Sequence, residues 1–110
     1  MKKAIFLLLI IVFNCSLFAQ TEVTVTGYIY DSETKQSLAY VNIGFVKKAV
    51  GTVSDEGGFF QLTYKTNKIG INDVLQISSI GYQTKKLKAS EFYTQLARSN
   101  KIYLQPQPYS

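Results

Sequence analysis

Histidine and tryptophan are absent from the sequence, and cysteine and methionine occur once each. Without histidine, the chain lacks the most common general base and the most common zinc ligand of proteins. Charged residues make up only 17% of the sequence, whereas about 25% is typical of soluble proteins. Aromatic residues are abundant, with 8 tyrosines and 7 phenylalanines among 110 residues. These counts favour one small, non-catalytic domain with an apolar core.

Residues 1–19 differ in kind from the rest of the chain and have the layout of a secretory signal peptide. Two lysines follow Met1, an uncharged apolar run occupies residues 4–13, and a more polar stretch ends at Ala19. This arrangement predicts cleavage before Gln20, which leaves a domain of residues 20–110. We therefore expect an exported protein, located in the periplasm, at the periphery of the outer membrane, or outside the cell.

Two other roles of this segment stay open. It could be retained as a membrane anchor, but a spanning helix needs about 20 apolar residues, and Asn14 and Ser16 interrupt this run. Cys15 could carry a lipid, although residues 12–14 differ from the small residues that usually precede a lipidated cysteine. Cleavage after Ala19 would remove the only cysteine, so we expect no disulfide, thiol nucleophile or thiolate metal site.

The sequence after Glu22 alternates between apolar and polar residues, which is typical of half-buried strands. Strands are expected near residues 23–30, 38–45, 50–53, 59–64, 74–79, 83–87 and 100–105. The only helical candidate is Ser90–Ala97, with Ser90 as its N-cap. Seven short strands with frequent turns predict an antiparallel sandwich. The expected core is formed by Val25, Ile29, Val41, Ile43, Phe60, Leu62, Leu75, Ile77, Ile102 and Leu104.

Five motifs along the chain together resemble one known family. They are Val25-x-Gly27-x-Ile29-x-Asp31, Leu38-x-x-Val41-x-Ile43, Gly51-Thr52-Val53-Ser54-Asp55-x-x-Gly58-x-Phe60-x-Leu62, Asp73-x-Leu75-x-Ile77-Ser78-x-x-Gly81-Tyr82 and Ile102-x-Leu104-x-Pro106. This pattern, over residues 23–106, resembles the carboxypeptidase regulatory-like domain found in exported proteins of Gram-negative bacteria. The resemblance implies an all-β fold, a seven-stranded antiparallel Greek-key β-sandwich of the transthyretin-like (prealbumin-like) or Ig-like type.

The resemblance also implies an accessory role. Similar domains stand beside the catalytic domain of some metallocarboxypeptidases and at the N-terminus of many TonB-dependent outer-membrane transporters. The zinc-dependent machinery of those peptidases belongs to a separate domain, so the resemblance carries no peptidase activity over to this chain. The sequence departs from the family pattern at Lys47-Lys48, where a small polar turn is typical, and at Gly57, which precedes the expected Gly58.

Few residues are candidates for chemistry. Asp55 and Glu56 could be a calcium or catalytic pair, but calcium takes six to eight oxygen ligands, and a turn role fits the pair better. A nucleophilic Ser54 or Ser79 would lack a histidine base. We therefore expect no enzyme activity, no catalytic residues, no cofactor and no metal site.

Four tyrosines offer a functional hint. Tyr28, Tyr30, Tyr40 and Tyr103 alternate away from the aliphatic side of three expected strands. If those strands are neighbours, the tyrosines form an exposed stripe suited to protein or glycan contact. The competing interpretation is ordinary cross-strand pairing, which stabilises a sheet without any ligand.

Two classes of function follow. The first is an interaction module that binds another envelope protein, for example a component of an outer-membrane transporter. The alternative is a small glycan- or peptide-binding module of an outer-membrane uptake system. Once Lys2 and Lys3 are removed, the net charge falls to a mild +3, so no nucleic-acid partner is expected. After cleavage of the signal peptide, no transmembrane span is expected either.

Overall fold

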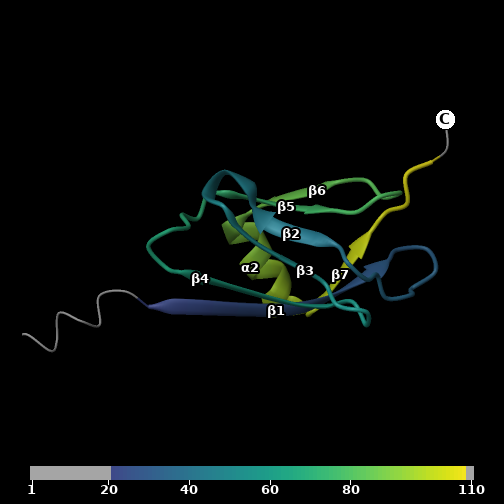
Figure 1. Ribbon diagram of the computed structural model, residues 1–110, viewed down its shortest axis with the longest axis horizontal. Helices are drawn as coiled ribbons and strands as arrows, with labels where there is room; N and C mark the ends of the chain where they lie inside the picture. Colours follow the sequence, from purple (N-terminus) through teal and green to yellow (C-terminus); the bar gives the residue numbers. More distant parts are fainter. Residues whose placement is uncertain (1–20, 109–110) are drawn as a thin grey trace, which may run out of the picture.

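Two β-sheets pack face to face in the computed structural model of the chain, which describes residues 21–108 (Figure 1). One sheet has the strand order β4-β1-β7 and the other β3-β2-β5-β6. The strands are β1 (Glu22–Asp31), β2 (Asn42–Phe45), β3 (Val50–Val53), β4 (Phe59–Lys65), β5 (Val74–Ser78), β6 (Lys85–Lys88) and β7 (Lys101–Leu104). The expected seven-stranded sandwich is confirmed. The predicted signal peptide, including Cys15, lies outside the described residues.

One strand pair departs from the expected antiparallel arrangement. The β1–β4, β2–β3, β2–β5 and β5–β6 pairs are antiparallel, but β1 and β7 are parallel, with Tyr30 opposite Tyr103. Parallel neighbours need a long connection. Here the chain passes through the other sheet and the helix α2 (Ala89–Arg98) before β7 returns beside β1.

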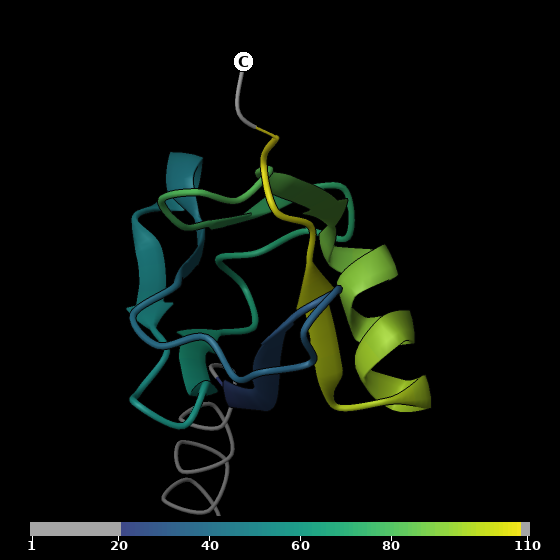
Figure 2. The same cartoon turned by 90° about the vertical axis from the view of Figure 1, so that its right-hand side faces the viewer.

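The helix closes one side of the sandwich. Seen from the end, α2 lies on the side where β6 and β7 run, and it contacts β5 and β6 (Figure 2). Its N-cap is Lys88, so the expectation of Ser90 is wrong. The backbone N–H groups of Ala89 and Ser90 donate to the carbonyls of Asp73 and Ile71 in the β4–β5 connection, which allows the helix to begin earlier. No helix among the described residues is long and apolar enough to cross a membrane.

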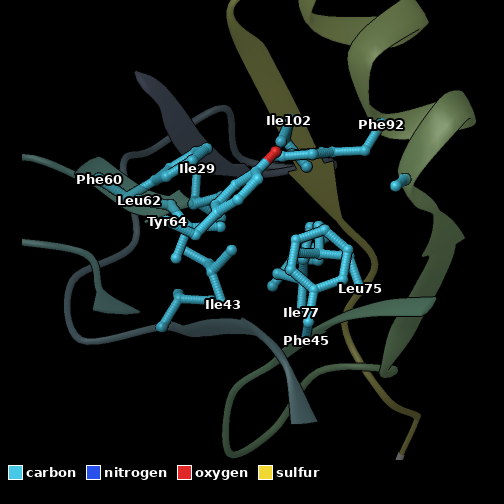
Figure 3. Packing of buried hydrophobic residues seen from close by; sticks show 13 residues of the cluster. Ile29, Ile43, Phe45, Phe60, Leu62, Tyr64, Leu75, Ile77, Phe92 and Ile102 are labelled. Atoms are coloured by element: carbon cyan, nitrogen blue, oxygen red, sulfur yellow. The ribbon is translucent and has the colours of Figure 1, made fainter. Parts of the chain in front are cut away.

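The core lies between the sheets, and Phe92 adds to it from the helix (Figure 3). Nine of the ten expected core residues are buried, and Val25 is only half-buried. Val25 lines a hollow near Ile69 at one end of the sandwich, where the inner faces are not completely covered. The core also contains Phe45, Tyr64, Ala89 and Phe92, which were not in the expected set.

Candidate functional site

The hairpin tip between β3 and β4 contains the acidic pair Asp55 and Glu56. One carboxylate oxygen of Asp55 accepts hydrogen bonds from the backbone N–H groups of Gly57 and Phe59, at 2.9 and 3.0 Å. Glu56 is exposed and accepts a hydrogen bond from the hydroxyl of Tyr40 at 3.4 Å. The Asp55 carboxylate therefore holds the turn together, as its position in a Ser-Asp-x-Gly-Gly sequence predicts.

Ser54 and Gly58 join this hairpin to the neighbouring strands. The Ser54 side chain is buried, accepts a hydrogen bond from the Val41 N–H and donates one to the Leu38 carbonyl, both at 2.9 Å. Gly58 has a φ of +82°, and a Cβ atom there would lie 2.7 Å from the Ile29 carbonyl oxygen. Only glycine fits this close approach without strain.

Asp31 and Tyr82 form a contact that links the end of β1 to the β5–β6 connection. The Tyr82 hydroxyl donates to the Asp31 carboxylate at 2.8 Å, and the backbone N–H groups of Glu33 and Thr34 donate to its other oxygen. The Thr34 N–H and the Tyr82 hydroxyl lower the pKa of Asp31 below its ordinary value. The same bond raises the pKa of Tyr82. This bond joins residues 51 positions apart in the sequence, and the sequence analysis did not identify it.

Aromatic side chains gather on the outer face of the three-stranded sheet. We call Tyr28, Tyr30, Phe59 and Tyr103 the tyrosine surface. The Tyr28 ring centroid lies 5.3 Å from that of Phe59 and 6.4 Å from that of Tyr30, which in turn lies 5.8 Å from Tyr103. Tyr103 is 39% exposed, and the other three are half-buried against one another. The strand order β4-β1-β7 therefore produces one continuous aromatic row.

The fourth predicted site residue, Tyr40, lies elsewhere. It precedes β2 of the other sheet and is 64% exposed. Its φ of +59° breaks the alternation that the sequence analysis assumed, and its hydroxyl reaches Glu56 at the hairpin tip. The structure thus brings together three of the four tyrosines. It adds Phe59, which the antiparallel register places opposite Tyr28.

Two lysines lie over rings of the tyrosine surface. The Lys35 ammonium is 4.8 Å from the Tyr103 ring centroid, and the Lys101 ammonium is 5.8 Å from that of Tyr30. Both distances are within the range of cation–π attraction. Neither lysine was identified from the sequence. Lys35 belongs to a loop, and the path of that loop is set by its contacts with the sheet.

A second hollow lies on the outer face of the other sheet. Gly44 and Gly51 are direct partners on β2 and β3, so no side chain covers the backbone there. Exposed Val46 and Val53 stand at its border. The signal in the sequence was a pair of glycines on consecutive strands, which the sequence analysis did not use.

Acidic side chains are dispersed over the described part of the chain. Within residues 21–108, no group of three or more His, Cys, Asp or Glu residues is arranged to hold a metal ion. Asp73 forms an ion pair with Lys48 at 3.8 Å. Glu91 accepts a hydrogen bond from the Lys88 N–H at 3.4 Å. These two carboxylates are thus in contact with Lys48, the last residue of a short 3-10 helix (Val46–Lys48), and with the N-terminus of α2.

A family model described as the CarboxypepD_reg-like domain matches residues 25–107, a range that contains both sheets and the helix. No curated protein and no solved structure matches the chain. Within the matched range, Asp31, Ser54, Gly58 and Tyr82 all make the structural contacts described above.

Proposed function

The chain belongs to the carboxypeptidase regulatory-like domain family, and from this premise we propose that it is an exported, non-catalytic module that binds another protein of the bacterial cell envelope. Domains of this family are regulatory β-sandwich modules. The observation that carries the binding role is the tyrosine surface. It lies on the open outer face of a sheet whose inner face already has its core.

Sheet stability alone does not explain this surface well. Cross-strand aromatic pairs stabilise a sheet, and half-buried Tyr28 and Phe59 can be assigned that role. Tyr103, however, is exposed on a short strand at the border of the sheet. Tyrosine is enriched in protein interfaces because its ring packs while its hydroxyl can still form a hydrogen bond.

The binding role is tested by capture from envelope extracts. We expect the double variant Tyr30→Ser/Tyr103→Ser to lose a partner that the parent retains in stoichiometric amount. Tyr40→Ser is the matched control, because Tyr40 is more exposed than Tyr103 but lies before β2 of the other sheet. Equal capture by the parent and the double variant would contradict the proposal. So would direct binding of neutral sugars by the purified protein, which is the signature of the alternative glycan-binding module.

Export is supported by the sequence of residues 1–19. Mass analysis of the protein from an expressing bacterium should give Gln20 as the first residue. Intact Met1 or a lipid-modified Cys15 would require an anchored form instead.

The non-catalytic role is tested with peptidase, esterase and glycosidase substrates, with and without added zinc or calcium. We expect no turnover. Turnover that copurifies with the protein and disappears in Asp55→Asn or Glu56→Gln would instead make the hairpin tip an active site.

A further inference from the structure

Three lysines from separate parts of the chain border the tyrosine surface. Lys35 belongs to the connection after β1, Lys101 begins β7, and Lys85 begins β6. The first two lie over tyrosine rings, and Lys85 lines a shallow hollow together with Tyr103 and Gln105. The ammonium groups thus border the rings at the edge where the two sheets meet.

These positive charges are not neutralised by neighbouring carboxylates. In the described residues, the only ion pair within 4.0 Å is that between Lys48 and Asp73. Asp31 ends β1 and contacts Lys35 through its backbone carbonyl, but its carboxylate is buried and already accepts three hydrogen bonds. Glu33 is exposed in the same loop as Lys35. Because none of the three lysines forms an ion pair with a carboxylate among residues 21–108, their border of the tyrosine surface is positively charged.

The backbone holds Lys35 in place. Its φ is +64°, in the left-handed region that lysine seldom adopts. Its N–H donates to the Asp31 carbonyl at 2.9 Å, and its ammonium group donates to the Ser32 carbonyl at 2.6 Å. The charge is therefore fixed above the Tyr103 ring before any partner arrives.

The ring faces indicate what kind of partner fits. A sugar binds to tyrosine by stacking on an open ring face, but ammonium groups lie over Tyr30 and Tyr103. The Tyr28 ring faces its aromatic neighbours. The surface therefore offers ammonium and phenol hydroxyl donors together with ring edges. Carboxylates accept charge-assisted hydrogen bonds from such donors.

We propose that the tyrosine surface binds an acidic segment of a partner protein, with carboxylates placed between Lys35, Lys85 and Lys101. This inference rests on the proposed function and adds the chemistry of the partner. An acidic polysaccharide would also bring carboxylates, but its rings would compete with the lysines for the tyrosine faces. A protein segment can place carboxylates at the lysines and small apolar side chains against the ring edges.

The test uses the full chain as purified from an expressing bacterium, and short random peptides displayed on phage as the probe. We expect the selected peptides to be enriched in Asp and Glu. Their affinity should fall roughly tenfold or more between about 50 mM and about 500 mM NaCl, because exposed ion pairs are screened by salt. Lys35→Gln/Lys85→Gln/Lys101→Gln should weaken binding by a similar factor. The matched control is Lys47→Gln/Lys68→Gln/Lys86→Gln, which removes the same charge from other exposed positions and should bind like the parent.

The outcomes separate this inference from the proposed function. Neutral peptides whose binding depends on Tyr30 and Tyr103 would overturn the acidic segment while the interaction module stands. Peptides that bind equally well to Tyr30→Ser/Tyr103→Ser would overturn both. Equal losses in the two lysine triples would show that only net charge matters, which contradicts a defined site. Alginate, an acidic polysaccharide, serves as the second probe, and binding of alginate but not of acidic peptides would also overturn the inference.

Discussion

Tyr82 and Tyr103 are used in opposite ways by the same fold. The Tyr82 hydroxyl is bonded to the buried Asp31 carboxylate and helps to tie the two sheets together. Tyr103 stands on the outer face, with its ring under the Lys35 ammonium. The first belongs to an internal frame that also includes Ser54 and Gly58, and the second belongs to the tyrosine surface. Asp31, Ser54, Gly58 and Tyr82 of the family-like motifs lie in the frame, so the resemblance concerns the fold and does not identify a partner.

This division allows one architecture to carry different surfaces. The frame needs particular residues, because Gly58 must have positive φ and the Ser54 hydroxyl must bond to two backbone groups at once. The outer face needs only side chains that tolerate a half-exposed sheet position. Function is therefore determined by the surface residues that the fold leaves free to vary.

The largest difference should appear between two neighbouring phenylalanines of β4. Phe60 is 1% exposed and packs on Phe92, whereas Phe59 is half-buried on the tyrosine surface. Phe60→Ala should lower the free energy of unfolding by about 3–5 kcal/mol, because it leaves a cavity in the core. Phe59→Ala should lower the free energy of unfolding by only about 1 kcal/mol. Urea unfolding measures both, and equal losses would show that the two faces of β4 are not distinguished as described.

The next difference concerns two adjacent glycines at the hairpin tip. Gly58→Ala should cost roughly 2–3 kcal/mol, because its φ is +82° and its new Cβ would press on the Ile29 carbonyl. At Gly57 the nearest atom to a new Cβ is an Asp55 oxygen at 3.6 Å, an ordinary contact. Gly57→Ala should therefore change stability by less than about 0.5 kcal/mol. Thermal unfolding of the two variants compares them directly, and a stable Gly58→Ala protein would disprove the role of Gly58 in the frame.

The strands and most of the core could be predicted because alternation in the sequence records which side of a strand is buried. Val41, Ile43 and Leu75 are examples, and all three are buried. The parallel pairing of β1 with β7 could not be predicted, because the alternation of Ile102 and Leu104 indicates a strand but not its neighbour in the sheet. The same limit hid the bond between Asp31 and Tyr82, which are 51 residues apart.

The candidate site was only partly predictable for a related reason. Tyr28, Tyr30 and Tyr103 follow the alternation of their strands, so their outward direction could be inferred. Tyr40 follows the same pattern in the sequence, but its positive φ turns the chain and places it near Glu56. Lys35 reaches the surface through a loop, and loops carry no periodic signal that relates a residue to a strand.

A smaller effect should separate Tyr82 from the surface tyrosines. Tyr82→Phe removes the hydroxyl that donates to Asp31 and should cost roughly 1 kcal/mol near neutral pH. Tyr103→Phe removes an outer hydroxyl and should leave stability unchanged within about 0.5 kcal/mol. Chemical unfolding at pH 7 compares the two. A loss in Tyr103→Phe as large as that in Tyr82→Phe would remove the distinction between frame and surface.

The same bond predicts a pH dependence. Because the pKa of Asp31 is lowered from 3.8 in the folded protein, its contribution to stability is present above that value and is lost as the pH falls below it. Tyr82→Phe removes one of the hydrogen bonds that lower the pKa of Asp31. The stability lost between about pH 6 and about pH 3 should thus be smaller in Tyr82→Phe than in the parent. Identical acid profiles would mean that the Tyr82 hydroxyl does not hold the Asp31 charge.

The smallest expected effect on stability concerns Lys35 and gives the sharpest separation of stability from binding. Lysine at a φ of +64° is strained by about 1–2 kcal/mol. Lys35→Gly relieves that strain but gives the unfolded chain more freedom, which costs about 0.4–1 kcal/mol. The net change in stability should be close to zero or slightly favourable.

Ala49→Gly makes the same backbone change at a φ of +53° with no loss of charge. Both variants should unfold within a few degrees of the parent. Only Lys35→Gly should weaken the binding of acidic peptides, because the ammonium group over Tyr103 is lost. If both variants bind like the parent, the Lys35 charge has no part in recognition, which contradicts a site shared by Lys35, Lys85 and Lys101.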